Sequence, residues 1–144
     1  MNVEAILRTK GTKVVTVTPE TTVGETAKIL KRARIGAAVV SSDGNDVLGI
    51  VSERDIVSAL AEPTKRTGLV DKPVSSLMTR DVLTCEPEDT VQKCMSVMTE
   101  HRVRHLPVMR ENSMVGLISI GDVVKNRLEE LESEAGFLRE LIAS

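Results

Sequence analysis

Three features of this chain predict an α/β (α+β) fold. The fold consists of two pseudo-symmetric β-α-β-β-α modules with an extended C-terminal helix. The first is an internal repeat, because Thr16–Val57 is written a second time as Thr84–Val124. The second is periodicity, since both copies alternate short strand-like runs with segments whose apolar residues recur at helical spacing. The third is an apolar stripe that continues the last helix of the second copy. Two copies are too few for a solenoid, so we expect two small modules that bury each other's apolar faces and carry two related versions of any ligand site.

Each copy begins with a strand and a helix. The strands are predicted at Val14–Val17 and Val82–Cys85, each followed by a proline that ends the run. Thr22 and Thr90 suit the start of the next helix, because a threonine hydroxyl can accept a bond from a free amide of the first turn. The helices themselves are expected over Val23–Arg34 and Val91–Arg102.

Two strands joined by a polar turn come next in both copies. They are predicted at Ala37–Ser41 and Val47–Val51, and again at His105–Met109 and Met114–Ile118. Asp43-Gly44 is a strong signal for a tight hairpin turn in the first copy, and Glu111-Asn112-Ser113 takes its place in the second. A closing helix opens at Ser52 or Ser119, so each module should place its helices on one face of a short sheet.

The repeat also suggests domain boundaries. Residues 1–62 form the first motif with an N-terminal lead-in, 63–73 an exposed linker marked by Pro63 and Gly68, 74–127 the second motif, and 128–144 a helical extension. The lead-in recurs loosely, since the apolar residues before each copy are Val3, Ile6 and Leu7 in one case and Val74, Leu77 and Met78 in the other.

The C-terminal extension carries a heptad-like stripe. Its apolar residues alternate at spacings of four and three: Val124, Leu128, Leu131, Ala135, Leu138 and Ile142. A stripe of this kind suits a homodimer held by two helices. Gly136 weakens a continuous helix by about 1 kcal/mol relative to Ala, so the tail folding back on its own domain stays open as an alternative.

Composition excludes several classes of function. The chain is 41% hydrophobic and 28% charged with a net charge of -2, which fits a globular protein and argues against a nucleic-acid partner. Its aromatic content is 1%, all of it Phe137, so a bound base must lie between aliphatic side chains and backbone. No apolar run approaches the ~20 residues that span a bilayer, and Met1–Lys13 lacks the apolar stretch of a signal peptide. We therefore expect a cytoplasmic protein with no membrane partner, in which Cys85 and Cys94 are reduced, buried thiols rather than a disulfide.

A Gly-x-x-Ser-x-x-Asp sequence occurs in both copies and carries the most chemistry. In each, an apolar strand ends at a serine, Ser52 or Ser119, and an aspartate follows in the first turn of a helix, Asp55 or Asp122. A serine beside the free amides of a helix N-terminus can bind a phosphate or hydroxyl, and the carboxylate can accept both vicinal hydroxyls of a ribose. The same residues can instead form a capping box that serves only their own helix. The pattern alone leaves both interpretations open.

Basic residues supply a second part of a nucleotide site. Arg104 and His105 stand at the start of a strand, and Arg54 lies inside the first serine-aspartate turn. Arginine suits phosphate because its planar fork donates two bonds at once. Lys31 and Arg32 are better explained as a solvated charge cluster.

Together, the repeated Thr-x-x-Pro, the Arg-His-Leu-Pro-Val strand at 104–108 and the repeated Gly-x-x-Ser-x-x-Asp resemble a pair of CBS domains, the modules named after cystathionine beta-synthase. The resemblance runs from Val3 to about Arg127 and is to the stand-alone bacterial type. It implies a regulatory module whose two motifs pack through their sheets and leave two clefts for adenosine-containing ligands such as AMP, ADP, ATP or NAD(H). It also implies that the module signals to a protein partner, which the sequence does not identify, by a change of conformation.

The resemblance further implies a role for each matching residue. Asp55 and Asp122 would hold ribose hydroxyls, while Ser52 and Ser119 would contact ribose or phosphate. The adenine pocket would be lined by Thr16 and Thr84, with aliphatic walls from Ile35 and Val103. The phosphates would be met by Arg54, Arg104 and His105. Gly36 and Ala37 stand in the first copy where the second has Arg104 and His105, so the two sites are not expected to be equivalent.

Other classes of function find less support. His101 and His105 are separated by an expected helix-to-strand break, so we expect no metal site. No set of nucleophile, base and orienting residue is suggested, and the chain lacks a Gly-rich phosphate loop, so we expect no catalytic residues, no enzymatic activity and no required cofactor. The stronger alternative is a structural dimerisation or partner-binding scaffold with no small-molecule ligand.

Overall fold

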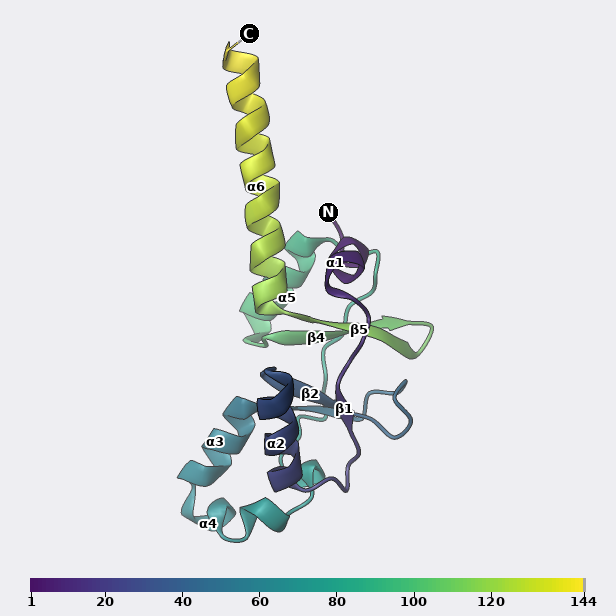
Figure 1. Cartoon of the computed structure of the whole chain (residues 1–144), viewed down its shortest axis with the longest axis vertical. Coiled ribbons are helices and arrows are strands. Elements are labelled where there is room, and N and C mark those ends of the chain that lie inside the picture. Colours follow the sequence, from purple (N-terminus) through teal and green to yellow (C-terminus); the bar gives the residue numbers. More distant parts are fainter. Residues whose placement is uncertain (144) are drawn as a thin grey trace. The chain divides into compact units, whose positions relative to one another are not determined.

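The computed structural model describes residues 1–143 and forms two compact units, each with its own small sheet (Figure 1). Unit 1 is assembled from Met1–Thr12, Thr84–Arg110 and the chain from Val115 onward, and unit 2 from Lys13–Leu83 and Glu111–Met114. The mixed α/β class and the extended C-terminal helix are confirmed. The compact units do not follow the two halves of the sequence, because the N-terminal lead-in belongs to the unit that holds most of the second copy.

Unit 2 is built on a sheet of three strands in the order β1-β2-β3. The strands are β1 (Thr16–Val17), β2 (Ala37–Val40) and β3 (Gly49–Ser52), with β1 parallel and β3 antiparallel to β2. Helices α2 (Val23–Ala33) and α3 (Glu53–Ala61) lie on one face of this sheet (Figure 1). The core of this unit contains Val17, Leu30, Ala38, Val40, Val51 and Val74. Every residue of β2 is buried, so this strand runs through the core.

The segment after α3 is only partly the exposed linker that the sequence predicts. It contains α4 (Pro63–Arg66) and two 3₁₀ helices, η1 (Leu69–Asp71) and η2 (Val74–Ser76). Residues 61–68 are exposed, but Leu69 is buried and packs with Val23 and Ala59. Leu69 therefore anchors the segment to unit 2.

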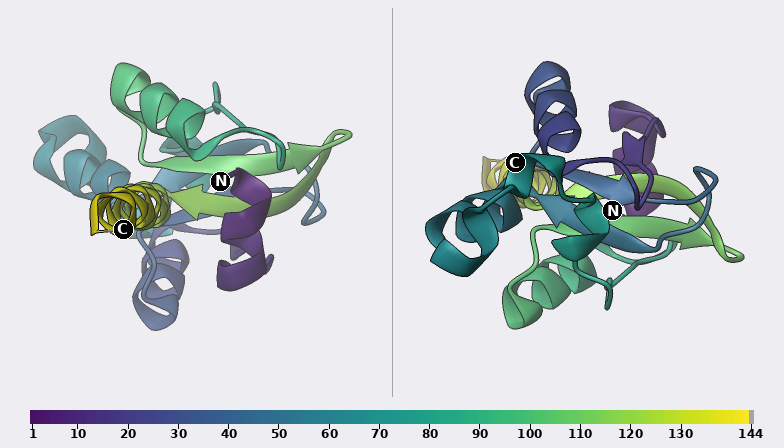
Figure 2. Two further views of the ribbon diagram at one scale, coloured as in Figure 1. Left: turned by 90° about the horizontal axis from the view of Figure 1, so that it is seen from above. Right: turned by 90° about the horizontal axis from the view of Figure 1, so that it is seen from below.

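Unit 1 is built on the hairpin of β4 (His105–Arg110) and β5 (Ser113–Ser119). Helices α1 (Val3–Lys10) and α5 (Val91–His101) lie on the same face of this hairpin (Figure 1), and Figure 2 shows α5 along one edge and α1 along the other. The turn of this hairpin, which is grouped with unit 2, is tight because Glu111 and Asn112 both adopt left-handed backbone, with φ of 48° and 65°.

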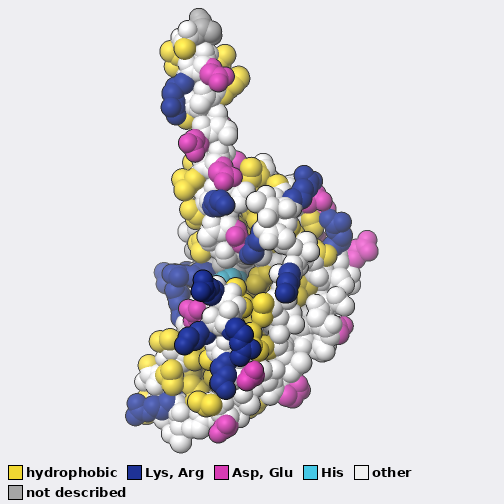
Figure 3. Space-filling model, in the orientation of Figure 1, with side chains coloured by type: hydrophobic (Ala, Val, Ile, Leu, Met, Phe, Trp, Pro, Cys, Tyr) yellow, Lys and Arg dark blue, Asp and Glu magenta, His cyan; other side chains and the backbone are white. Residues whose placement is uncertain are grey.

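Helix α6 (Ile120–Ala143) continues directly from β5 and extends beyond α1 and α5 (Figure 1). Val123 is buried in unit 1, but most of the predicted stripe is exposed: Val124, Leu128, Leu131, Leu138 and Ile142. Figure 3 shows hydrophobic side chains interleaved with charged ones along this helix. Among residues 1–143, no helix combines the length and the apolar character needed to cross a membrane.

Helix starts agree with the sequence prediction. The Thr22 hydroxyl accepts a bond from the Glu25 amide at 3.1 Å, and the Thr90 hydroxyl accepts one from the Lys93 amide at 3.0 Å. Both hydroxyls satisfy amides that have no partner inside the helix.

The first strand of each copy is shorter than predicted. Val14–Val17 reduces to Thr16–Val17, and Val82–Cys85 reduces to a single bridge between Cys85 and Val108. Cys85 donates to the Pro107 carbonyl and accepts from the Met109 amide, at 3.0 and 2.8 Å. One residue therefore makes the whole backbone ladder on this edge of the hairpin.

The predicted tight turn of the first copy is wrong. A longer loop, residues 41–48, separates β2 from β3. Within it the Asp46 carboxylate accepts bonds from the Ser41 hydroxyl at 2.6 Å and from the Ser42 amide at 2.8 Å, and these bonds hold the pKa of Asp46 below its usual range. The Asp46 carboxylate thus accepts the Ser42 amide, a backbone donor that would bond a backbone carbonyl in a two-residue turn.

Candidate functional site

The two serine-aspartate turns have the same internal geometry. In unit 2 the Asp55 Oδ2 accepts from the Ser52 amide at 2.8 Å and from its hydroxyl at 3.1 Å, while the Ser52 Oγ accepts from the Asp55 amide at 3.3 Å. In unit 1 the corresponding distances for Ser119 and Asp122 are 2.8, 3.0 and 3.2 Å. The capping-box interpretation is therefore confirmed for the first turn, and the second turn repeats its bonds.

Helix capping engages one carboxylate oxygen of Asp55 and of Asp122 and leaves the other without a hydrogen bond from residues 1–143. All of these bonds fall on Oδ2, and Oδ1 of Asp55 and of Asp122 accepts no hydrogen bond from residues 1–143. Both aspartates are half-buried in the first turn of a helix. Each turn thus offers a fixed carboxylate oxygen next to a helix N-terminus, where hydroxyl and phosphate groups bind well.

Asp122 has an additional partner that sequence reasoning missed. Lys10, in the last turn of α1, donates from Nζ to the Asp122 Oδ2 at 2.6 Å and to the Leu117 carbonyl at 2.8 Å. Burial raises the pKa of Asp122, but the bonds from Lys10 and from the Ser119 amide outweigh it, so the pKa lies below its ordinary value. No local pattern links Lys10 to a residue near the other end of the chain.

The start of the β-hairpin strand lies beside each turn. In unit 1 the Arg104 carbonyl accepts from the Ile120 amide at 2.8 Å, and in unit 2 the Gly36 carbonyl accepts from the Glu53 amide at 2.9 Å. The exposed Arg104 and the half-buried His105 therefore adjoin the Ser119 turn. The same position in unit 2 carries no charge, because Gly36 and Ala37 stand there.

Arg54 and the expected adenine-pocket residues are placed as follows. Arg54 is exposed in the first turn of α3 and makes no ion pair within the described chain. Ile35 lies two residues before the start of β2 and packs partly on the core of unit 2, and Val103 lies two residues before the start of β4 in unit 1. Both are half-buried aliphatic side chains close to a turn.

Thr16 and Thr84, the threonines expected to line the adenine pocket, lie farther from the serine-aspartate turns in the strand pairing. Thr16 pairs with Val39, two positions beyond the Ala37 that pairs with Ser52, and β2 separates it from β3. Thr84 is exposed and directly precedes the bridge residue Cys85. The structure thus groups the predicted residues by unit, with Thr16, Ile35, Ser52, Arg54 and Asp55 in unit 2 and Thr84, Val103, Arg104, His105, Ser119 and Asp122 in unit 1.

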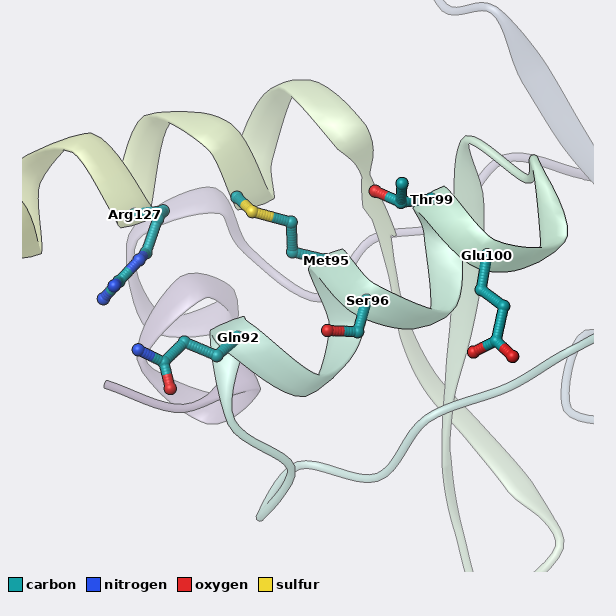
Figure 4. A pocket seen from close by; sticks show the side chains of 6 residues that line it. All are labelled: Gln92, Met95, Ser96, Thr99, Glu100 and Arg127. Carbon is teal, nitrogen blue, oxygen red and sulfur yellow. The ribbon is translucent and has the colours of Figure 1, made fainter.

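An open groove of about 720 Å³ runs along α5 in unit 1 (Figure 4). It is lined by Gln92, Met95, Ser96, Thr99, Glu100 and Arg127. None of the predicted nucleotide contacts lines it, and Figure 4 places its side chains on the outer face of α5 with Arg127 reaching over from α6. The groove is therefore a feature of the α5–α6 surface, separate from the serine-aspartate turn.

The cysteines and histidines form no metal centre within residues 1–143, where no group of three or more potential ligands is found. Cys85 and Cys94 are both buried and neither is in a disulfide. A hydrogen bond to Cys94, together with burial, raises the pKa of the Cys85 thiol. The two cysteines therefore form a contact in the core of unit 1.

Comparison with known proteins supports this description. The sequence matches the family model for the CBS domain over residues 3–62 and 74–129. The crystal structure of the CBS-domain containing protein ATU1752 from Agrobacterium tumefaciens is similar, with 42% identity and a TM-score of 0.83, covering 88% of this chain and 99% of that one. The CBS domain-containing protein YhcV of Bacillus subtilis is 31% identical over 121 residues, which is 83% of each chain.

A further similar structure has bound ligands. The CBS domain pair of protein MJ0100, solved in complex with 5′-methylthioadenosine and S-adenosyl-L-methionine, is 25% identical to this chain, with a TM-score of 0.75. The match covers 87% of this chain and 98% of that one. For ATU1752 and YhcV the similarity extends over most of both chains, and the MJ0100 structure is that of a CBS domain pair of its protein.

Proposed function

The chain belongs to the CBS domain family, and we propose that it is a sensor that binds adenosine-containing ligands at its two serine-aspartate turns and signals their presence to a partner protein. The observation that carries the proposal is the doubled turn itself. Each copy fixes an aspartate through Oδ2 and leaves Oδ1 available beside a helix N-terminus. A capping box alone needs no second oxygen and no neighbouring cation.

The ligand class follows from the chemistry around the turns. A carboxylate oxygen suits the hydroxyls of a ribose, and Arg54, Arg104 and His105 suit phosphate. The walls near the turns are the aliphatic Ile35 and Val103, which can hold a flat base without aromatic stacking. The complex of the MJ0100 domain pair with two adenosine compounds supports adenine as the base. We propose AMP, ADP, ATP or NAD(H) as ligands, in a regulatory and not a catalytic role.

Thermal unfolding and calorimetry with a panel of nucleotides test this function. A ligand that binds only the folded state stabilises it by about 2.7 kcal/mol at a hundredfold excess over Kd. AMP, ATP or NADH should therefore raise the melting temperature by several degrees, and GMP or CMP should raise it less. If millimolar adenine nucleotides leave the melting curve unmoved, the sensor function is refuted.

Substitution of the aspartates locates the binding. Hydrogen bonds to charged groups contribute about 1.5–3 kcal/mol, so Asp55→Ala or Asp122→Ala should weaken AMP binding at the altered turn roughly tenfold to a hundredfold. Asp89→Ala is a matched control, because Asp89 also bonds a backbone amide, of Glu86 at 2.9 Å, and pairs with a lysine, Lys93 at 3.0 Å. The control should lose stability but keep its affinity. Unchanged affinity in both Asp55→Ala and Asp122→Ala would refute the ribose-clamp assignment.

A scaffold function is the second candidate, and the exposed stripe of α6 favours it. Leu128, Leu131 and Leu138 are 60%, 43% and 58% exposed. Their heptad-like spacing would let two copies of α6 pack against each other along their apolar stripes. We propose that the stripe supports a homodimer, which is compatible with ligand sensing and would remain if no ligand were found.

A further inference from the structure

The lysine on α1 makes the two turns chemically different. Asp122 Oδ2 accepts from the Ser119 amide, the Ser119 hydroxyl and Lys10 Nζ, whereas among residues 1–143 Asp55 Oδ2 accepts only the two bonds from its own serine. In the second lead-in, the position that matches Lys10 is Asp81. Unit 2 therefore has an acidic residue, and not a lysine, at the position that matches Lys10.

With three donors on one oxygen, the Asp122 carboxylate has a single free acceptor. A ribose presents two neighbouring hydroxyls, and it can use both oxygens of Asp122 only if Lys10 moves away. The side chains of Lys10 and Asp122 are 37% and 24% exposed, so the pair is accessible to a ligand. Partly exposed ion pairs are weak, and the flexible stem of lysine allows its ammonium group to move to a nearby anion.

Other residues around the Ser119 turn favour an anion. Arg104 adjoins the first amide of α6, and Gly121 in the first turn has only the Ser119 Oγ within 4 Å of a Cβ position. The Ser52 turn has Glu53 and Arg54 at the two positions where the Ser119 turn has Ile120 and Gly121. A phosphate thus meets Arg104 and bare backbone at the Ser119 turn, whereas at the Ser52 turn it meets the Glu53 carboxylate beside Arg54.

We infer that Lys10 is a specificity-determining residue that makes the Ser119–Asp122 turn select ligands with a phosphate over the corresponding nucleoside. The inference rests on the proposed function. A nucleoside whose two ribose hydroxyls bond both oxygens of Asp122 has to displace Lys10 from Oδ2 and offers its ammonium group no new partner. A nucleotide displaces the same ammonium group and supplies a phosphate as its new partner, so Lys10 opposes one ligand and favours the other.

The inference predicts opposite effects of one substitution. Lys10→Met removes the charge and keeps an apolar stem, so adenosine should bind this turn up to about fivefold more tightly, the factor that corresponds to loss of a partly exposed ion pair. AMP should bind roughly threefold to tenfold more weakly, because a charge-assisted bond to phosphate is lost. A purely structural role of Lys10 would shift both affinities in the same direction.

The test is calorimetry with AMP and adenosine on chains that carry Asp55→Ala, so that only the Ser119 turn reports. Lys10→Met is compared with Lys10→Arg, which keeps the charge and should keep the preference for AMP. Lys125→Met is the matched control, because Lys125 is exposed on α6 and forms no ion pair among residues 1–143. Circular dichroism melting confirms that each variant is folded at the titration temperature.

The outcomes separate this inference from the proposed function. A fall in the ratio of AMP to adenosine affinity in Lys10→Met, absent in Lys10→Arg and Lys125→Met, supports the role of Lys10. An unchanged ratio in a chain that still binds AMP overturns the role of Lys10 and leaves the sensor function intact. Failure of the unsubstituted chain to bind either ligand refutes the proposed function itself.

Discussion

Leu7 packs its side chain onto the bare backbone of Gly116, so closely that a Cβ on this glycine would lie 2.6 Å from Leu7 Cδ2. Met78 and Gly49 repeat the arrangement, with 2.6 Å between the same Cβ position and the Met78 sulfur. The two glycines occupy the same place in the repeat, and so do Leu7 and Met78 in their lead-ins. Each lead-in therefore closes the unit that contains its glycine, and the lead-in of one copy serves the other copy's unit.

The contacts at Gly49 and Gly116 predict that replacing each glycine by alanine destabilises the protein to a different extent. At Gly49 a Cβ would also lie 2.9 Å from the Thr79 carbonyl, which is fixed by a bond from the Ile50 amide at 3.0 Å. At Gly116 only the end of the Leu7 side chain is in the way, and it can shift. Gly49→Ala should lower the free energy of unfolding by about 1–3 kcal/mol, and Gly116→Ala by less, as measured by urea unfolding.

Gly136 supplies the control for this pair. It lies inside α6 with nothing within 4 Å of its Cβ position, so Gly136→Ala should be neutral or stabilise by up to about 1 kcal/mol. Equal losses at Gly49 and Gly116 would contradict the distinction between a backbone and a side-chain obstacle.

The bond between Lys10 and Asp122 predicts a dependence of stability on pH. The pKa of Asp122 is lower in the folded chain than its ordinary value of about 3.9. Its contribution is therefore present above about pH 4 and is lost as the pH falls through the folded pKa. Because the pair is partly exposed and screened by solvent, we expect a loss of about 0.2–1 kcal/mol in Lys10→Met at pH 7.

Urea midpoints measured from pH 7 to pH 3 check this expectation. The difference between the unsubstituted chain and Lys10→Met should be constant at neutral pH and shrink below pH 4. A difference that stays constant across the whole range would mean that Lys10 acts through packing of its stem and not through the carboxylate.

Local patterns account for much of the fold. The repeat, the helix starts at Thr22 and Thr90, and the opening of helices after Ser52 and Ser119 depend on residues close together in sequence, and all are confirmed. The lengths of β1 and of the strand expected at Val82–Cys85 were wrong, because pairing with a single neighbour decides how far an edge strand extends. The position of Leu69 was missed because its apolar partners lie on two different helices.

The candidate site divides in the same way. The sequence predicts the serine-aspartate turns from a motif, and the position of Arg104 beside one of them from the order of the strands. The contact between Lys10 and Asp122 could not be predicted from the sequence, because it forms only when α1 packs in the unit built mainly from the second copy. The single signal in the sequence is a mismatch, a lysine in one lead-in against Asp81 in the other.

The two buried cysteines predict low thiol reactivity. Cys85 and Cys94 are 5% and 1% exposed, and the hydrogen bond to Cys94 together with burial raises the pKa of the Cys85 thiol. Alkylation requires an exposed thiolate, so iodoacetamide should react at least about 10³-fold more slowly with the native chain than with the unfolded one. Intact-mass analysis over time measures this. Prompt modification of either thiol in the native chain would show that this part of unit 1 opens.

The exposed stripe of α6 predicts a change in oligomeric state on truncation. Removing Glu132–Ser144 deletes Leu138 and Ile142 but keeps Glu130, which accepts a bond from Arg127 at 3.0 Å. The truncated chain should shift from dimer toward monomer in analytical ultracentrifugation at micromolar concentration. Its melting temperature measured at high dilution serves as the control and should match that of the full chain. A truncated chain that remains dimeric would contradict a role of Leu138 and Ile142 and would assign the interface to Leu128 and Leu131, which it keeps, or to another surface such as the groove along α5.

The crossed lead-ins set the order in which the chain can fold during synthesis. Helix α1 leaves the ribosome well before Gly116 and Asp122, its partners in unit 1. Until then the apolar side chains of Val3, Ile6 and Leu7, all buried in the finished protein, have nothing to cover them. Unit 2, whose segments are almost contiguous, can form while the nascent chain is still growing. During synthesis α1 must therefore stay undocked, or be shielded by a chaperone, until Gly116 and Asp122 have been translated.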